Sequence, residues 1–289
     1  MSRKPFYLAV LVLAIMTLAC NTVTNIPINR FQTGPTRTED IEVPLPEDSD
    51  AVAEVELDFG AGRLQLSPGA EGTLISGTAT YNVDEFAPEV SSRGNQVTIS
   101  QNRESFEGIP LLRGDLENEW DLNLADAPMI LQINAGAYEG IYELGGLAIQ
   151  DLRITDGAAK SELEFSEPNQ VEMDTLRYDT GASSVNLSGL ANANFSEMIF
   201  KCGAGDYTLD FSGDLQRDAS ISIDSGLANV TIVVPEGVSA SLTVDGGLTN
   251  VDVGGSWRSS GSEYTVSGDG PTLSFTVQMG AGNLQLESR

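Results

Sequence analysis

The chain has 289 residues, of which 42 are acidic, 15 are basic and none is histidine, so its formal charge is −27. This charge excludes nucleic acid as a partner, because phosphate binding requires clusters of lysine and arginine. The absence of histidine removes the commonest general base and the commonest metal ligand from the available chemistry. With 40% apolar and 20% charged residues, the composition is that of a folded protein rather than a disordered chain.

The N-terminal residues have the features of a secretory signal. Arg3 and Lys4 precede an uncharged apolar run over residues 6–18, which is too short to cross a bilayer of about 30 Å as a helix. The run ends in Ala19-Cys20, a pattern that resembles the bacterial lipobox. We therefore expect cleavage of residues 1–19 and acylation of Cys20. The lipid would anchor the protein in the bacterial cell envelope, on the outer face of the cytoplasmic membrane or on an outer membrane. An ordinary secretory signal or a retained anchor is the alternative.

Residues 20–50, which begin with the acylated cysteine, are predicted to form a flexible tether. Proline, threonine and asparagine are spread through this stretch, no apolar period persists in it, and acidic residues gather at its end. Such a composition is typical of semi-extended linkers. Lipid must hold the protein at the membrane, because an anionic surface would repel an acidic body, and two acyl chains suffice for stable anchoring.

The remainder of the chain is dominated by one motif, apolar-x-apolar-x-x-Gly-small-x-x-apolar-x-apolar. Alternation with a period of two on both sides of a glycine predicts two short strands that meet at a corner. Such a corner needs either a positive φ or a close approach of backbones, which explains the glycine. The Ala or Leu that follows the glycine is expected to point inward. The motif occurs eight times, with a period of about 22 residues in its regular part, and its glycines are Gly60, Gly136, Gly157, Gly181, Gly203, Gly226, Gly247 and Gly280.

This pattern predicts an all-β fold, a β-solenoid similar to a parallel β-helix, because stacked repeats share a core that one repeat cannot form alone. An antiparallel sandwich of hairpins is the alternative, since glycine-centred turns serve both architectures. Residues 51–128 are predicted as an N-terminal β domain with a long loop over 102–128. Residues 129–289 are predicted as the repetitive β-solenoid domain, with an excursion at 254–270 and a polar C-terminal end that caps the stack.

Two stretches of the sequence resemble a known family. TEDIEVPLPEDSDAVAEVELDFGAGRLQL is similar to the N-terminal domain of the toast-rack family of bacterial envelope proteins, and TLRYDTGASSVNLSGLANANFSEMIFKCGAGDYTLDFSGDL is similar to the related Lia-type C-terminal domain. The resemblance covers roughly residues 36–289 and implies an all-β, solenoid-like and adhesin-like protein. The family has no established active site to carry over. Some relatives act in the cell-envelope stress response by way of a membrane segment, which we do not expect after the signal of this chain.

The sequence offers few groups for catalysis. A serine triad is impossible without histidine, and Cys202 has no histidine partner either, so we interpret it as a structural thiol. Trp120 and Trp257 are candidates for stacking on sugars, although such residues more often close a β core. The alternative class is a carbohydrate-active β-helix enzyme that uses paired carboxylates, with or without Ca²⁺. Among 42 acidic residues such pairs arise by chance and are no evidence for it.

One polar column is ordered, at the position two residues before the corner glycine. If the rungs stack in sequence order, Asp224 and Asp245 lie about 4.8 Å apart, and a divalent cation such as Ca²⁺ would relieve their repulsion. We favour the interpretation that these side chains cap the turn backbone and face water, which leaves the two aspartates as weak metal candidates. The column comprises Asp58, Asn134, Asp179, Asp224, Asp245 and Gln278.

These observations favour a lipid-anchored, non-enzymatic module that needs no cofactor. Repeat arrays offer long, regular surfaces that suit the binding of an extended partner. We therefore expect a binding or structural role in the envelope, with an envelope protein or a glycan as the partner.

Overall fold

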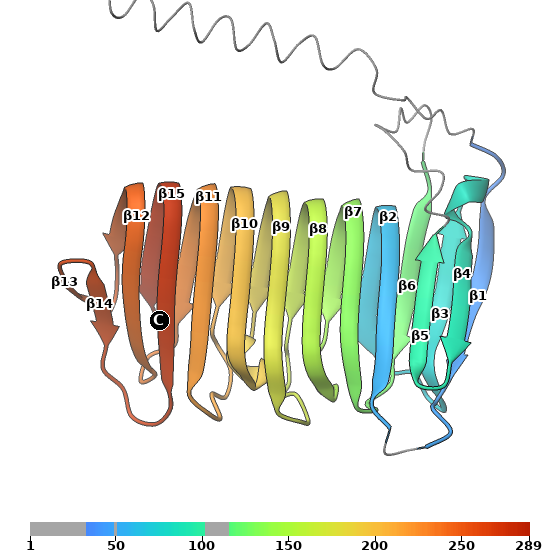
Figure 1. Ribbon diagram of the computed structural model, residues 1–289, viewed down its shortest axis with the longest axis horizontal. Helices are drawn as coiled ribbons and strands as arrows, with labels where there is room; N and C mark the ends of the chain where they lie inside the picture. Colours follow the sequence, from blue (N-terminus) through green and yellow to red (C-terminus); the bar gives the residue numbers. More distant parts are fainter. Residues whose placement is uncertain (1–32, 49–50, 102–115) are drawn as a thin grey trace, which may run out of the picture.

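The computed structural model describes residues 33–48, 51–101 and 116–289, and these form an all-β protein. Its strands make one open 15-stranded sheet that extends along the long axis of the molecule (Figure 1). Within the described residues, no helix has the length and apolar character needed to cross a bilayer. The strands are β1 (Arg37–Pro44), β2 (Ala53–Pro68), β3 (Thr73–Tyr81), β4 (Pro88–Arg93), β5 (Gln96–Gln101), β6 (Asn118–Leu124), β7 (Met129–Glu143), β8 (Ile149–Glu164), β9 (Met173–Ser188), β10 (Phe195–Asp210), β11 (Ala219–Val234), β12 (Ser239–Val253), β13 (Arg258–Ser260), β14 (Glu263–Val266) and β15 (Thr272–Ser288), with 3-10 helices η2 (Asp84–Phe86) and η4 (Leu190–Ala193) in connections.

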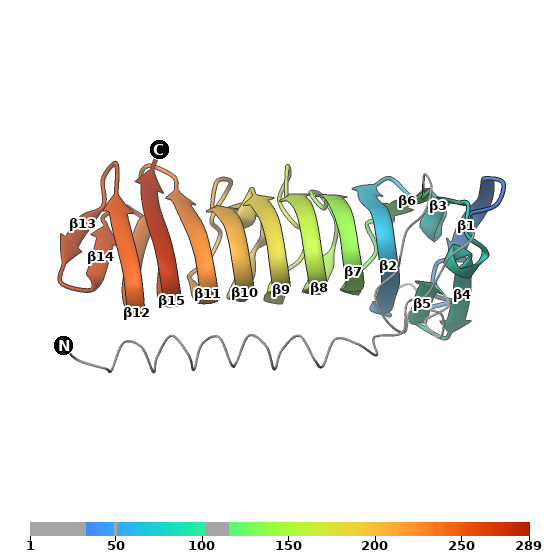
Figure 2. The same ribbon diagram turned by 90° about the horizontal axis from the view of Figure 1, so that it is seen from above.

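Eight long strands correspond to the eight copies of the motif. They pair in parallel in the order β2, β7, β8, β9, β10, β11, β15 and β12, and each bends at its corner (Figure 2). Equivalent motif positions align, so that Phe200 of β10 faces Tyr178 of β9 on one side and Ile223 of β11 on the other. The predicted all-β class is confirmed, and the antiparallel alternative is wrong for these strands.

Side-chain alternation decides what is buried in each long strand. In β11, Ile221 and Ile223 are buried, whereas Ser222 and Asp224 are exposed. The inward side chains of all the long strands join one hydrophobic cluster, which extends from β1 to β15. The core is therefore continuous across residues 128 and 129, where the sequence suggested a domain boundary.

The C-terminal strand lies inside the array rather than at its end. β15 pairs in parallel with β11 on one side and with β12 on the other, although β12 precedes it in the sequence (Figure 1). The predicted excursion at 254–270 contains β13 and β14, which form an antiparallel hairpin on the outer edge of β12. The expectation that the C-terminal end caps the stack is therefore wrong, because β12 and this hairpin form that end of the sheet.

The opposite end of the sheet corrects two further predictions. Residues 37–44 were expected in the tether but form β1, which pairs antiparallel with β3 and buries Ile41 and Val43 among its acidic residues. Residues 118–124 were expected in a long loop but form β6, which pairs with β3 and β2. The predicted signal, Cys20 and the start of the tether lie outside the described residues, as do residues 102–115.

Close approach of backbones, rather than a positive φ, requires glycine at the corners. A Cβ on Gly181 would lie 2.3 Å from the carbonyl oxygen of Gly157, and none of the eight corner glycines has a left-handed φ. The second glycine of a Gly-Ala-Gly string is left-handed instead, as at Gly205 with φ +150°. The predicted inward orientation of the residue after the corner glycine is wrong, because Leu227 is 66% exposed. The alanines at this position in four other copies, Ala137, Ala158, Ala182 and Ala204, are exposed as well.

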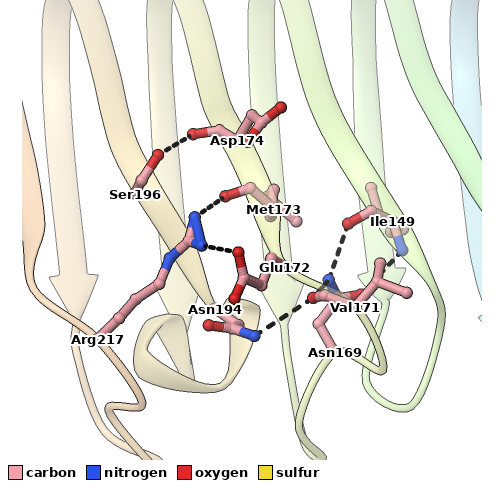
Figure 3. Close-up of polar contacts among 9 residues, drawn as sticks. All are labelled: Ile149, Asn169, Val171, Glu172, Met173, Asp174, Asn194, Ser196 and Arg217. Carbon is pink, nitrogen blue, oxygen red and sulfur yellow. Dashed lines mark hydrogen bonds and ion pairs between the residues drawn. The ribbon is translucent and has the colours of Figure 1, made fainter.

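The loops that connect the rungs are tied to one another by side chains (Figure 3). Asn169 accepts a hydrogen bond from the backbone N–H of Ile149 at 2.9 Å and donates to the carbonyl of the same residue at 2.8 Å. Arg217 reaches from the β10–β11 loop to the start of β9, where it donates to Glu172 and to the carbonyl of Met173, both at 2.8 Å. These contacts hold the edge opposite the corners.

Candidate binding cleft at the fork of the sheet

The sheet divides at the corner of β2. The first arm of β2 pairs with β5 through residues 54–58, and the second arm pairs with β6 through residues 63–68. Side-chain amides complete the backbone hydrogen bonding between the arms: Gln101 accepts from the N–H of Gly60 at 2.9 Å, and Asn118 donates to the carbonyl of Ala61. Gln101 is 2% exposed and also donates to Asn118 at 2.9 Å, so buried hydrogen bonds link the two arms at the fork.

A cleft of about 740 Å³ opens at this fork, where the corners of β2, β7 and β8 lie side by side. β2 and β7 supply most of its wall, β5 contributes one buried glutamine, and β8 contributes Thr155. Pockets of this size suit small ligands or single side chains of a partner. The residues that line it are Glu56, Asp58, Phe59, Gly60, Ala61, Gln101, Gln132, Asn134, Ala135, Gly136, Ala137 and Thr155.

Two carboxylates on one strand form the polar wall of the cleft. Asn134 donates through Nδ2 to Glu56 Oε1 at 3.0 Å and to Asp58 Oδ1 at 2.9 Å. Gln132 donates through Nε2 to the same oxygen of Glu56 and to Asn134 Oδ1, both at 3.4 Å. The amide hydrogens therefore point at acceptors inside the wall. Asp58 is 8% exposed, so its carboxylate is held in a largely dehydrated position.

The floor of the cleft is apolar. Phe59 is 3% exposed, and its ring packs edge-on against Trp120 at 5.2 Å and Tyr138 at 6.2 Å between ring centroids. Alanine side chains from β2 and β7 line the rest, and none of the described residues around the cleft is basic. The cleft combines an alkyl-lined floor with an acidic, hydrogen-bond-accepting wall.

The predicted metal candidates are not brought together. Asp224 aligns with Gln278, and Gln278 aligns with Asp245, so the two carboxylates lie two rungs apart, roughly 9–10 Å. On the other side of Asp224, Lys201 lies between it and Asp179. The expected separation of one rung is wrong because β15 occupies the intervening place. Among the described residues, no three or more Cys, Asp or Glu are grouped as metal ligands.

A second polar cluster lies inside the core at the corner of β8. Asp156 is 7% exposed and accepts hydrogen bonds from Tyr178 at 2.9 Å and from Thr180. The hydroxyls of Tyr138 and Ser183 approach it at 3.4 Å. Burial raises the pKa of the Asp156 carboxyl, while these hydroxyls partly oppose the change in pKa by stabilising the ionised form. The hydroxyls supply the partners that a buried carboxylate requires, and the cluster ties three rungs together.

The remaining candidates from the sequence are buried. Cys202 is 6% exposed, and burial raises the pKa of its thiol to about 11, which leaves little of the reactive thiolate at neutral pH. Trp120 is fully buried, and Trp257 is 6% exposed and donates to the carbonyl of Glu287 at 3.0 Å. Neither tryptophan offers an open face to a sugar.

Sequence reasoning found part of this cleft. Asp58 and Asn134 belong to the predicted polar column, and the structure places them in direct contact. Glu56, Gln132 and Gln101 were missed. A signal for the first two is their position four residues before the corner glycine, on the same face as the column. No signal identifies Gln101, because its strand lies outside the repeat.

The chain has a weak likeness to several solved structures. The solved structure of a candidate cell adhesion protein from Clostridium sporogenes has a TM-score of 0.49 and 16% identity, covering 88% of this chain and 100% of that one. A candidate lipid-binding protein from Parabacteroides distasonis has a TM-score of 0.42 and 12% identity, covering 88% and 99%. A candidate adhesin from Bacteroides fragilis has a TM-score of 0.38 and 11% identity, covering 89% and 99%. Likeness this weak assigns no function.

At the level of sequence, no curated protein matches the chain. The family model described as the N-terminal domain of toast_rack, DUF2154, matches residues 32–175 and 168–233. This match spans well over half of the chain and includes the fork, the cleft and the first six corner glycines. The chain therefore belongs to the toast-rack family.

Proposed function

We propose that this protein is a lipid-anchored, non-enzymatic binding module of the bacterial cell envelope, built as a β-solenoid with an adhesin-like or structural role. The observation that carries the proposal is the cleft of about 740 Å³ at the fork of an otherwise regular sheet. The anchor would be the acylated Cys20, and the partner would be an envelope protein or a glycan. A link to the cell-envelope stress response is part of the same proposal.

Contrast with the rest of the array supports the cleft as the binding site. On the second arms, Arg63 pairs with Glu139 at 3.0 Å, so these exposed charges satisfy each other. Further along, Asn229 donates to Asp206 at 2.8 Å, and Asn283 donates to Asn229 at the same distance. These columns are ladders of mutually bonded side chains along the rungs. In the cleft, a similar set of bonded side chains from β2 and β7 lies beside an apolar floor made by Phe59 and alanines.

The charge of the body supports a lipid anchor. A protein with a formal charge of −27 is repelled by anionic lipids, so residence at a membrane requires a hydrophobic attachment. We expect Cys20→Ala to move the protein from the membrane fraction to the soluble fraction or to leave it unprocessed. Fractionation of the bacteria with detergent extraction measures this, and unchanged membrane retention of processed Cys20→Ala protein would refute acylation.

A glycan-cleaving enzyme is the second candidate, because Glu56 and Asp58 place two carboxylates in one cleft. Glycoside hydrolysis needs their roles to differ, one as acid and one as base or nucleophile. Here one amide donates to both alike, which provides no such distinction. The test incubates the purified chain with cell-wall and polysaccharide substrates, with and without Ca²⁺, and measures bound protein and released reducing ends. Retention without product supports the binding module, and product that Glu56→Gln abolishes would establish the enzyme.

A further inference from the structure

We propose that the outer edge of the second arm of β12 is a docking site for an extended, cationic segment of a partner protein, which pairs with it as one more strand. The second arm is the part of β12 that follows the corner at Gly247, residues 248–253. It lies at the opposite end of the array from β2 and the cleft (Figure 1), so the inference goes beyond the proposed function.

One edge of this arm has no partner strand. β12 pairs with β15 along both of its arms on one side. On its other side, the hairpin of β13 and β14 covers only the first arm, through residues 240–243. Among the described residues, no strand pairs with the outer edge of residues 248–253. An uncovered strand edge is a template for pairing with another chain.

The ladder with β15 shows which backbone groups face this open edge. Gly254 donates its N–H to the carbonyl of Leu286 on β15 at 2.8 Å. In a parallel ladder only alternate residues bond to a given neighbour, so the preceding even-numbered residues of the arm face β15 as well. Thr249, Val251 and Val253 therefore direct their N–H and C=O groups away from the array. Because backbone amides and carbonyls are strong hydrogen-bonding groups, this row is a site with the shape of a strand.

The apolar columns of the core are incomplete at the same arm. Val251 and Val253 align with Leu284 and Leu286 of β15. Both leucines are fully buried, whereas Val251 is only partly buried and Val253 is 42% exposed. On the first arm, the hairpin closes the core with Tyr264, which is 9% exposed. A further strand with apolar residues at alternate positions would do the same for the second arm, because the end of a stacked array needs a cap.

Charge and space select the occupant. Asp252 is exposed on the outer face of the arm, where Asn250 donates to it at 3.1 Å, and the whole chain has a formal charge of −27. These charges attract a segment with lysine or arginine between its apolar residues and repel a second copy of this chain. The hairpin also projects beyond β12 at this end (Figure 1), where the body of a second array would have to lie. A single strand needs less room.

The test measures peptide binding to the full chain by fluorescence anisotropy at physiological ionic strength. The probe is a labelled peptide in which valine and lysine alternate. One control peptide has the same residues in two blocks, and a second carries glutamine in place of lysine. Val251→Pro removes one outward N–H and spares the bonds to β15, while Val251→Thr keeps that N–H and the branched shape. Glu56→Gln/Asp58→Asn in the cleft and Glu162→Gln/Glu164→Gln, which removes two exposed carboxylates with the same spacing on β8, separate the edge from other acidic surfaces.

We expect the alternating lysine peptide to bind and Val251→Pro to weaken its binding at least about tenfold, because the proline ring blocks the edge. Val251→Thr should change the affinity less than about threefold, and both carboxylate variants should bind like the wild type. The two control peptides should bind at least about threefold more weakly than the probe.

Three results would overturn the inference. Equal binding of the blocked peptide would show attraction to net charge alone, and equal binding of the glutamine peptide would show that the segment need not be cationic. Loss of the probe by Glu56→Gln/Asp58→Asn, with Val251→Pro unaffected, would place the peptide in the cleft. None of these results decides whether the cleft binds envelope material, which is measured separately.

Hydrogen–deuterium exchange needs no variant and so covers the case in which Val251→Pro does not fold. The bound peptide should slow amide exchange in residues 248–253 and leave β4, an edge strand near the other end of the sheet, unchanged. Equal slowing at both edges, or slowing at neither, would overturn the inference. Sedimentation of the protein alone tests the second copy as occupant. A dimer that Val251→Pro dissociates would assign the edge to self-association and overturn the inference.

Discussion

Replacement of Gly181 by alanine tests why the corners of the array are glycine. A Cβ on Gly181 would lie 2.3 Å from the carbonyl oxygen of Gly157, whereas ordinary contacts begin at 3.4 Å. The neighbouring strands would have to separate by roughly 1 Å, and both groups are backbone in a parallel ladder, so no side chain can rotate away. Such overpacking destabilises the folded state by about 1–3 kcal/mol. Alanine also lowers the conformational entropy of the unfolded chain, which offsets about 0.4–1 kcal/mol of this loss. We expect a net loss of about 1–2 kcal/mol.

The same substitution one rung away is the matched control. A Cβ on Gly157 would lie 3.2 Å from the carbonyl oxygen of Gly136, and neither glycine has a left-handed φ. The free energy of unfolding of Gly157→Ala should therefore lie within about 0.5 kcal/mol of the wild-type value. Urea unfolding of the full chain, followed by tryptophan fluorescence and circular dichroism, gives the midpoints and slopes to compare. Equal midpoints for the two variants would refute the argument from backbone approach.

Three further predictions concern the buried polar groups and the aspartate column. Burial raises the pKa of Asp156, so the folded state keeps this proton to higher pH than the unfolded state, and ionisation lowers stability as pH rises above about 4. The free energy of unfolding of Asp156→Asn, relative to that of the wild type, should therefore increase as the pH rises from about 4 to 8. A difference between the two proteins that does not change with pH would contradict this. Gln101→Ala removes the buried hydrogen bonds of Gln101 at the fork and should destabilise the protein by about 1–3 kcal/mol in thermal unfolding. Gln285→Ala, at an exposed position, should change the stability by less than about 0.5 kcal/mol. Similar losses in the two variants would show that the Gln101 hydrogen bonds do not stabilise the fork. EDTA should leave the melting temperature unchanged, because a glutamine on β15 separates Asp224 from Asp245, and a drop of several degrees would reveal a bound metal.

The repeat made most of the long strands predictable. Each copy alternates apolar and polar residues on both sides of a glycine, and strands β9, β10 and β11 follow this pattern with the same register. The inward set is therefore readable from the sequence alone. The orientation of the residue after the corner glycine could not be read in this way, because two consecutive residues face outward at the corner and break the alternation. The side chains of Leu227 and of the corner alanines are exposed for this reason.

The order of the last two long strands could not be read from the repeat. Any copy offers the same apolar columns to any other, so the motif does not say which strands are neighbours. The structure places Gln278 between Asp224 and Asp245 and so separates two charges that sequence order would have put side by side. The β13–β14 hairpin takes the chain around β12 and allows β15 to enter that place. Aromatic packing also contributes at this place in the sheet, where Phe275 of β15 lies edge-on to Phe211 with ring centroids 5.0 Å apart.

The cleft was only half visible in the sequence, for a related reason. Asp58 and Asn134 are repeat positions, but the opening beside them exists because β2 exchanges one partner strand for another at its corner. That exchange depends on β5 and β6, whose residues do not follow the motif. Glu39, Asp40 and Glu42 likewise concealed β1, whose two buried side chains look like part of an acidic linker.

Binding of the purified chain to isolated cell-envelope material tests the central claim most directly. The wild type, Glu56→Gln/Asp58→Asn and the control Glu162→Gln/Glu164→Gln are sedimented with this material at physiological ionic strength, and the bound fraction of each is measured. The account predicts retention of the wild type and the control and release of the cleft variant in its folded form. Equal retention of all three proteins would contradict it, because the cleft would then have no part in binding.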